Sequence, residues 1–461
     1  MTKNNYDVIV VGAGFAGVTA SRELSNKGYD TLTLEARDRI GGRTWFDKRL
    51  GKEIEMGGTY IHWNQPHMWA EITRYGIEVK ESPSAEHAYL ATKDKVIVDT
   101  QEFMTQKLME GMEVFLADAA ANRYFERPFN PYHDDSLKAV DQYSVADKLR
   151  EIQHAVTPEM NGLLNSLWSG YTSTSNLEAP GLAHAYRWAA LTGHDMQEFQ
   201  ATFEQYSMKT GTKSLIESMM ADSKSELRLS TPVDSVVKTT EGYKVVSREG
   251  EEFTCKAVVV AVPVNVLNDI KFTPELSEEK RAFSEEKQAS EGIKVWAKVR
   301  GLKGPSTFKA TAEFPVNLAH TEFINEAGDE GIIMGFGSDS TLDMNDPKAV
   351  EKALRVWIPD LEVIESAGHN WVEDEFAKGT WGVIKKEQLT KYGQEVKRPE
   401  GGVFLAGSDF ANGWAGYMDG AIETGLTTSR EVSKFLQVAQ TFNENLEDGN
   451  LEDENLAQVD D

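Results

Sequence analysis

The first 35 residues form a complete strand–turn–helix–strand unit, which constrains the fold more than any other part of the chain. Residues 8–11 are a continuous apolar run, as expected of a buried parallel strand. This run leads into a G-x-G-x-x-G motif, which is followed by a short helix that stops near Gly28. A second apolar strand then ends in an acid, Glu35. This order predicts an α/β fold of the dinucleotide-binding type.

Each glycine of the motif has its own physical role in such a unit. Gly12 allows the tight turn, Gly14 lets the backbone approach a pyrophosphate, and Gly17 lets the helix pack close to the sheet. The helix N-terminus offers free N–H groups to the phosphates, and Glu35 can accept hydrogen bonds from a ribose hydroxyl. The alternative is a glycine turn that binds no ligand. Because the strands, the helix and the terminal acid are all present, we favour the dinucleotide interpretation.

The segment after Glu35 distinguishes between the two common dinucleotides. The sequence "EARDRIGGRTW" continues with Arg37, a pair of glycines at 41 and 42, and Arg43. An NAD enzyme has no evident use for a second glycine turn and an arginine at this place. An extended FAD molecule, whose phosphates lie along one track, does have a use for both. The sequence therefore favours FAD.

The composition argues against several other classes of protein. A net charge of −26 argues against nucleic acid and against adhesion to anionic membranes. The single cysteine, Cys255, excludes a disulfide framework and fits a reducing cytoplasm. The N-terminal apolar run is short and enters the glycine motif directly, which is typical of a strand and not of a signal peptide. We therefore expect a cytoplasmic protein without a transmembrane helix.

Units of the nucleotide-binding kind occur at three places along the chain. Besides the N-terminal unit, "AVVVAVP" and "GGVFLAGSDF" each predict a buried strand, and "GYMDGAIETG" begins a closing amphipathic helix near Met418. Helical segments and a strand at residues 292–301 fill the gaps. We expect a discontinuous Rossmann-like FAD-binding domain with an inserted mixed α+β substrate domain. The expected boundaries are 1–85, 205–290 and 390–440 for the FAD-binding domain, 86–204 and 291–389 for the substrate-binding domain, and 441–461 for an acidic disordered tail.

Five blocks of sequence, taken together, resemble the flavin-dependent amine oxidase family. They are "VIVVGAGFAG", "LEARDRIGGRT", "EMGGTYIH", "VVVAVP" and "FLAGSDFANGWAGYMDGAIETG", and they follow the family's order over nearly the whole chain. Trp381, "GGTYIHWNQPHMW" and "IKVWAKVRG" are similar to the bacterial branch of nicotine, 6-hydroxynicotine and pseudooxynicotine amine oxidases. The resemblance implies FAD as the cofactor and amine oxidation as the activity.

The resemblance also implies which residues contact the cofactor. Gly57 and Gly58 are expected to lie against the flavin ring system, where a Cβ atom would clash. Asp409 is expected to contact the ribityl or phosphate region, and Met418 to offer a backbone N–H to the pyrimidine edge. Thr380 stands where mammalian relatives have the cysteine that binds the flavin, so non-covalent FAD is expected. The full expected set is Gly12, Gly14, Gly17, Glu35, Arg37, Gly42, Arg43, Gly57, Gly58, Thr59, Val233, Gly407, Ser408, Asp409 and Met418.

Three residues are expected to carry the chemistry on the substrate side. In the family, aromatic residues at the positions of Trp381 and Tyr417 form a cage in front of the flavin, and a lysine at the position of Lys294 holds a water near flavin N5. Tyr60 and His62 are expected to complete the substrate pocket. Without the resemblance, the two aromatic residues would be interpreted as core and the lysine as a surface residue of a half-exposed strand.

The implied reaction is the oxidation of a small primary or secondary amine, with a nicotine-related amine as a candidate. Hydride transfer to flavin N5 gives an imine that water hydrolyses, and reoxidation by oxygen gives hydrogen peroxide; a protein electron acceptor is the alternative to oxygen. An L-amino-acid oxidase, with Arg187 as the candidate carboxylate ligand, and a non-catalytic flavoprotein stay open as rivals. The histidines lack metal-ligand spacing, so no metal is expected. A homodimer is the assembly considered for this chain.

Overall fold

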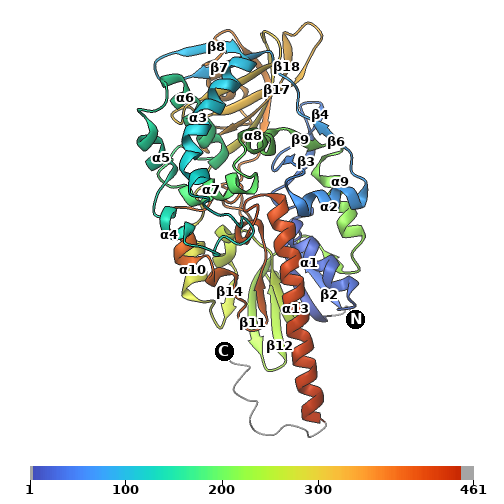
Figure 1. The fold of residues 1–461 in the computed structure, drawn as a ribbon. Coiled ribbons are helices and arrows are strands. Elements are labelled where there is room, and N and C mark those ends of the chain that lie inside the picture. Colours follow the sequence, from blue (N-terminus) through green and yellow to red (C-terminus); the bar gives the residue numbers. More distant parts are fainter. Residues whose placement is uncertain (1–3, 448–461) are drawn as a thin grey trace.

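The first of two large β-sheets contains the strand of the glycine motif. The computed structural model describes residues 4–447 (Figure 1). The strand order is β10-β2-β1-β13-β12-β11-β14, and β20 pairs with β13. β2, β1, β13 and β20 run parallel, so the expected Rossmann-like arrangement is confirmed. The strands are β1 (Asn5–Val11), β2 (Thr31–Leu34), β10 (Glu226–Arg228), β11 (Val233–Thr239), β12 (Gly242–Ser247), β13 (Glu252–Val260), β14 (Lys271–Thr273) and β20 (Val403–Leu405).

The second large sheet lies at the opposite end of the molecule, at the top of Figure 1. Its order is β19-β15-β18-β17-β16-β7-β8, and all neighbours are antiparallel except β16 and β7. The strand expected at residues 292–301 is β15 of this sheet. The strands are β7 (His87–Ala91), β8 (Val96–Thr100), β15 (Ile293–Arg300), β16 (Ser306–Ala310), β17 (Leu318–Ile324), β18 (Glu330–Gly337) and β19 (Glu362–Gly368).

Two small sheets lie between these large ones. One pairs β3 (Phe46–Arg49) with β4 (Lys52–Glu55). The other pairs β9 (Tyr206–Met208) with β5 (Tyr60–Ile61) and β6 (Val79–Glu81). The segment 55–61, which contains both glycines of the "EMGGTYI" stretch, therefore begins and ends in a paired strand.

Helices cover both large sheets. α1 and the long α13 cross beside the first sheet (Figure 1), and a Cβ atom at Gly425 would come within 2.6 Å of the Ala16 carbonyl oxygen, so the crossing requires glycine there. The helices are α1 (Phe15–Asn26), α2 (Pro66–Tyr75), α3 (Gln101–Ala121), α4 (Ser136–Val140), α5 (Val145–Ile152), α6 (Pro158–Thr172), α7 (Leu182–Leu191), α8 (Met196–Glu204), α9 (Gly211–Ala221), α10 (Glu278–Glu286), α11 (Pro347–Leu354), α12 (Gln388–Tyr392) and α13 (Met418–Glu447). Short 3₁₀ turns are η1 (Val264–Asp269), η2 (Glu395–Lys397) and η3 (Ser408–Phe410).

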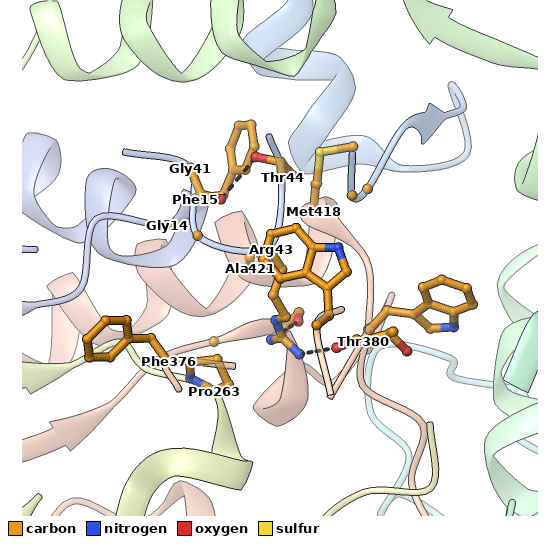
Figure 2. Close-up of a pocket in the computed structure, with 18 of the residues that line it drawn as sticks. Gly14, Phe15, Gly41, Arg43, Thr44, Pro263, Phe376, Thr380, Met418 and Ala421 are labelled. Atoms are coloured by element: carbon orange, nitrogen blue, oxygen red, sulfur yellow. Dashed lines mark hydrogen bonds between the residues drawn. The ribbon is translucent and has the colours of Figure 1, made fainter. Parts of the chain in front are cut away.

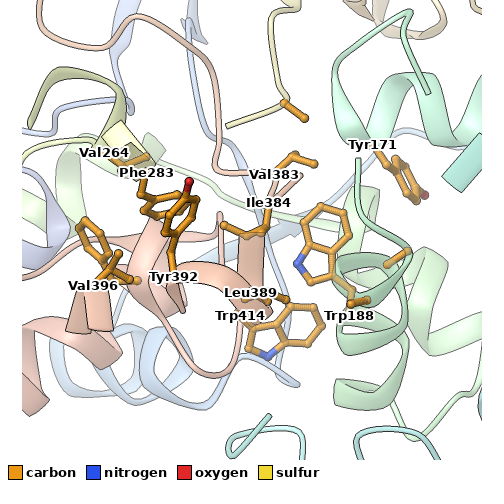
Figure 3. Close-up of a cluster of buried hydrophobic side chains, with 14 of the residues drawn as sticks. Tyr171, Trp188, Val264, Phe283, Val383, Ile384, Leu389, Tyr392, Val396 and Trp414 are labelled. Atoms are coloured by element: carbon orange, nitrogen blue, oxygen red, sulfur yellow. The ribbon is translucent and has the colours of Figure 1, made fainter. Parts of the chain in front are cut away.

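One hydrophobic cluster connects the helices to the first sheet. It contains Val11 of β1 and Val260 of β13 together with Trp168 of α6. Figure 3 shows part of it, where Trp188 of α7 and Trp414 lie among aliphatic side chains. Burial of this apolar surface is the main stabilising contribution to the fold. The helices and the first sheet therefore share this cluster.

The strands of the two large sheets come from interleaved stretches of the chain. The first sheet draws on residues 5–34, 226–273 and 403–405, and the second on residues 87–100 and 293–368. These stretches lie inside the expected ranges of the two domains. The division into two domains with these boundaries stays a prediction.

The C-terminal helix extends further than the sequence suggested. α13 runs to Glu447, so residues 441–447 are helical and the disordered tail expected from residue 441 begins too early. The physical reason is that no glycine or proline interrupts the chain between Gly425 and Glu447. The remainder of the expected tail lies outside the described residues. Over residues 4–447, no helix combines the length and the apolar character needed to cross a membrane.

Candidate active site

Residues of both large sheets line one cavity (Figure 2). The glycine motif after β1, the turn after β2 and the segment before α13 all contribute to it. Gly17, His62 and Asp409 are expected site residues that do not line it. Those that do are Gly12, Gly14, Glu35, Arg37, Gly42, Arg43, Gly57, Gly58, Thr59, Tyr60, Val233, Lys294, Trp381, Gly407, Ser408, Tyr417 and Met418.

The glycine motif leaves room for a ligand at one of its three positions. Gly12 has a φ of +103°, and a Cβ atom there would lie 2.7 Å from the Ala261 oxygen. A Cβ atom at Gly17 would overlap with the oxygen of Gly12. Around Gly14, in contrast, the only atom within 4 Å of such a Cβ is the Cα of Gly42, at 4.0 Å. Gly12 and Gly17 are thus required by the chain's own packing, whereas Gly14 faces the cavity.

The N-terminus of α1 provides donors beside this open space. Gly14 is its N-cap, and no side chain caps the helix and no acid lies in its first turn. The free N–H groups of such a terminus suit a phosphate. Glu35, at the end of β2, is buried and accepts hydrogen bonds from the N–H of Ala13 at 2.7 Å and of Arg37 at 2.9 Å. The site residues therefore fit an extended dinucleotide.

Arg43 connects three distant segments of the chain. Its guanidinium donates to the carbonyl oxygen of Thr380 at 2.9 Å (Figure 2), to Oγ of Ser408 at 3.2 Å and to Oδ2 of Asp409 at 3.0 Å. The Asp409 carboxylate also accepts the N–H of Val264 at 3.1 Å, and its side chain is fully buried. Asp409 does not line the cavity and its oxygens have partners inside the protein, so its expected contact with the ribityl or phosphate region stays a prediction. Charge pairing with Arg43 explains its burial.

Atoms of the chain itself constrain the pair Gly57–Gly58, and the expected contact of both glycines with the flavin stays a prediction. A Cβ atom at Gly57 would overlap with the oxygen of Arg43, and one at Gly58 would lie 3.3 Å from Cγ2 of Thr44. The N–H of Gly58 also donates to the Arg43 oxygen at 3.1 Å. Both glycines line the cavity, but the chain's own backbone already excludes a side chain at Gly57.

Lys294 is buried, with a side chain only 3% exposed, and is not a surface lysine. Its ammonium donates to the carbonyl oxygen of Gly57 at 2.9 Å and to Oγ1 of Thr59. Burial lowers the pKa of Lys294 to about 8, and the Glu55 carboxylate opposes this shift. Lys298, on the same strand, is exposed and does not line the cavity.

The two expected cage residues lie in the same cavity, each held by its surroundings. Nε1 of Trp381 donates a hydrogen bond to the carbonyl oxygen of Tyr171 at 2.9 Å. The Trp381 ring packs edge-on against Phe336, with ring centroids 5.6 Å apart. Tyr417 packs edge-on against Trp188 and Phe203 at 5.7 and 5.6 Å. Its buried hydroxyl has no partner within residues 4–447. These contacts fix both rings, and the polar atom of Tyr417 stays free for a ligand or water.

His62 does not form part of the cavity wall, contrary to expectation. Its ring is fully buried, with the Trp63 ring 4.0 Å away and Nε2 3.9 Å from Glu198. The β5 strand places Tyr60 toward the cavity, and His62 lies past its end. In the part of the chain that the structure describes, no three His, Cys, Asp or Glu side chains are grouped so that they could hold a metal ion.

Arg187, the candidate ligand for an amino-acid carboxylate, is buried in α7. It donates to the carbonyl oxygens of Ala411 at 3.1 Å and Asn412 at 2.8 Å, and it does not line the cavity. The three arginines that do line it are each paired with an acid: Arg37 with Asp374, Arg43 with Asp409, and Arg248 with Glu375. This arrangement does not favour an amino-acid oxidase.

The sequence profile of the family described as flavin containing amine oxidoreductase matches residues 15–433. The chain belongs to this family. This amine oxidoreductase is 36% identical over 442 residues to a pseudooxynicotine dehydrogenase of Pseudomonas sp, covering 94% of this chain and 87% of the relative. It is 34% identical over 441 residues to a nicotine dehydrogenase of Pseudomonas putida, covering 94% and 89%. The structure of cyclohexylamine oxidase from Brevibacterium oxydans matches with a TM-score of 0.75 at 20% identity, covering 94% of this chain and 99% of that one.

These similarities confirm the expected family, its flavin cofactor and its oxidoreductase activity toward amines. The resemblance to the nicotine-degrading branch is confirmed as well. The contacts of individual residues with FAD and substrate stay predictions.

Several residues of this amine oxidoreductase's cavity were not found from the sequence. They are Phe203, whose ring stacks on that of Tyr171 with centroids 3.7 Å apart, and the polar residues Glu204, Thr307, Lys309 and His320. One signal was available: "STFKA" places a lysine inside a short strand, between Phe308 and Ala310. The strand register that brings Lys309 to the cavity could not be read from the sequence.

Proposed function

We propose that this chain binds FAD without a covalent bond and oxidises a small primary or secondary amine, with nicotine-related amines as the favoured candidates. FAD, when bound, accepts a hydride equivalent from the carbon next to the amine nitrogen and passes two electrons to oxygen, so the products are an imine, which water hydrolyses, and hydrogen peroxide. The names of the two Pseudomonas relatives support the substrate class.

The observation that carries this proposal is the convergence of three distant residues on one cavity. Trp381, Tyr417 and Lys294 line the same cavity as the glycine motif. Aromatic rings, including those of Phe203 and Phe336, form the neighbouring wall. Such a wall favours a neutral amine, because an unpaired ammonium would lose its hydration without compensation. The two cage rings position the amine and exclude water around it.

The non-covalent attachment of FAD is supported by the absence of a cysteine at the site. Thr380 lines the cavity next to Trp381, and its hydroxyl contacts Oγ of Ser290 at 2.8 Å. The chain's single cysteine, Cys255, is buried in β13 and is not part of the cavity wall. A thioether to the flavin therefore has no donor in this chain.

Oxygen is the proposed acceptor, and a protein acceptor is the second candidate. The names of the relatives support both: the two from Pseudomonas are dehydrogenases, and the one from Brevibacterium oxydans is an oxidase. Peroxide release during turnover in air separates the two. Slow reoxidation by oxygen, accelerated by an added electron acceptor, would favour the protein acceptor.

The central test is anaerobic bleaching of the flavin absorbance by a panel of amines. We expect bleaching by secondary amines, including nicotine-related ones, at rates that exceed those for amino acids. Bleaching only by compounds with a free α-carboxylate would overturn the substrate class. No bleaching by any amine would favour the non-catalytic flavoprotein.

A further inference from the structure

A row of side chains crosses the cavity face of the second sheet. Lys294 of β15 lies opposite Phe336 of β18. Phe336 lies opposite Leu318 of β17, which in turn lies opposite Lys309 of β16. Directly opposed residues of antiparallel strands point to the same face of a sheet, and all four line the cavity. Two lysines therefore share one wall, three strand spacings or about 14 Å apart.

The two lysines differ in their partners. Lys294 is bound to the segment 57–59, whereas the Lys309 ammonium has no hydrogen bond or ion pair within residues 4–447. Lys309 is nevertheless only 6% exposed. The Lys309 carbonyl oxygen accepts a hydrogen bond from Nε1 of Trp357 at 2.8 Å, which helps to fix the strand. An ammonium that lines a cavity and has no partner among the described residues is available to a ligand that carries a hydrogen-bond acceptor.

Three other polar side chains of the cavity lining already have partners. Nε2 of His320 is 3.0 Å from Oε2 of Glu322, and the hydroxyl of Thr307 is bound to Gln101. Glu204 accepts a hydrogen bond from Nε2 of Gln200 at 3.1 Å. Compared with these three side chains, Lys309 is the one whose polar group has no partner in the described part of the chain.

We propose that Lys309 binds a hydrogen-bond acceptor at the end of the substrate that is remote from the amine. The inference rests on the proposed amine oxidation and narrows its substrate class. The substrate is an elongated amine that ends in a carbonyl oxygen, a carboxylate or an aromatic ring nitrogen. An α-carboxylate does not fit, because it is attached to the reacting carbon, whereas Lys309 stands two strands beyond Phe336, whose ring packs on Trp381.

The test uses holoenzyme and ligands that bind without reacting. These are primary amines whose α-carbon carries no hydrogen, matched in length and ending in a carboxylate, a ketone or a methyl group. Perturbation of the flavin spectrum measures each dissociation constant. Wild-type protein is expected to bind the acceptor-ended ligands on the order of 10- to 100-fold more tightly than the methyl-ended one.

Three variants test whether Lys309 causes this preference for acceptor-ended ligands. Lys309→Met is expected to remove it, and Lys309→Arg to retain it, because arginine keeps a charged donor. Met replaces an unpaired ammonium by an apolar chain, so the fold is expected to persist, and thermal unfolding checks this. Lys298→Met is the matched control, since Lys298 is an exposed lysine outside the cavity, and it is expected to leave all affinities unchanged.

The outcomes separate this inference from the proposed function. A loss of preference for both acceptor-ended ligands supports a general acceptor site, and a loss for the carboxylate alone supports an anionic substrate end. The inference is overturned if wild-type protein shows no preference, or if Lys309→Met keeps it. If instead no oxidisable amine bleaches the flavin, the proposed function fails, while the Lys309-dependent preference is still measured by the unreactive ligands.

Discussion

The ammonium of Lys294 donates a hydrogen bond to the main-chain oxygen of Gly57 at 2.9 Å, and this bond joins the second sheet to the segment 55–61. Two tryptophans act on the same segment: Nε1 of Trp296 donates to the Glu55 oxygen at 3.0 Å, and Nε1 of Trp371 to the Met56 oxygen at 2.9 Å. Three consecutive carbonyl groups are thus fixed by side-chain donors. A wall held in this way does not need to reorganise when substrate or cofactor arrives.

Replacing Lys294 by methionine is expected to slow reoxidation of the reduced enzyme by oxygen. The reduction of oxygen develops negative charge, and removing one preorganised positive group costs roughly 100-fold in such cases. The flavin content and the rate of anaerobic reduction should change much less. Rapid mixing of reduced enzyme with oxygen measures the effect, and a wild-type reoxidation rate in Lys294→Met would exclude the proposed role.

The pH dependence of the two half-reactions is expected to differ in sign. Because burial lowers the pKa of Lys294 to about 8, its ammonium loses the proton as the pH rises through that value. Reoxidation should therefore slow with rising pH, and this slope should be absent in Lys294→Met. Reduction should accelerate with rising pH, since the neutral substrate amine becomes more abundant. Separate rate measurements across a range that brackets the Lys294 pKa check both slopes.

Gly14→Val is expected to give folded protein without flavin. The backbone at Gly14 has a φ of −75°, which valine adopts readily, and the side chain would point into the cavity, where the pyrophosphate is proposed to lie. Gly17→Val is the matched contrast, because its side chain would overlap with the Gly12 carbonyl oxygen and lower stability by roughly 1–3 kcal/mol. Absorbance spectra and denaturant unfolding distinguish the two. Full flavin content in Gly14→Val would contradict the assignment.

Trp381→Ala is expected to slow flavin reduction by on the order of 100-fold while FAD stays bound. The ring is held by Phe336 and by the Tyr171 oxygen, so its loss removes positioning and admits water. Trp63→Ala serves as the control, because Trp63 is 44% exposed and lies outside the cavity wall. Single-turnover reduction rates give the answer; equal losses in both variants would indicate a structural effect only.

FAD is expected to leave the polypeptide when the protein is denatured. Thr380 offers no thiol, and Cys255 is buried in the sheet away from the cavity. Acid precipitation should therefore leave the yellow colour in the supernatant. Flavin that stays with the pellet after washing would overturn the non-covalent attachment.

The features that the sequence predicted correctly depend on neighbours along the chain. The strand before Gly12, the helix after Gly14 and the acid at Glu35 follow from local spacing, and the structure has each of them. The start of α13 at Met418 was equally clear, because an amphipathic pattern begins there. The family resemblance supplied the aromatic pair, which periodicity alone would assign to the core.

The features that the sequence did not reveal depend on tertiary contacts. A side chain at Gly57 is excluded by the Arg43 carbonyl, Asp409 is paired with Arg43, and His62 does not line the cavity. Lys309 reaches the cavity only through the register of three neighbouring strand pairs. No local sequence pattern predicts such tertiary contacts. A cytoplasmic location and a homodimer stay predictions.

The place of β20 beside β13 has a consequence for how the chain is made on the ribosome. The strand that carries the glycine motif is synthesised first, but the neighbour that completes the centre of its sheet ends at Leu405. At an elongation rate of about 5–20 residues per second, the ribosome needs roughly 20–80 s to reach that point. During this interval the edge of β13 at residues 258–260 lacks its neighbour and is open to pairing with another chain. Correct assembly of the cofactor half therefore depends on protection of an unfinished sheet until synthesis is nearly complete.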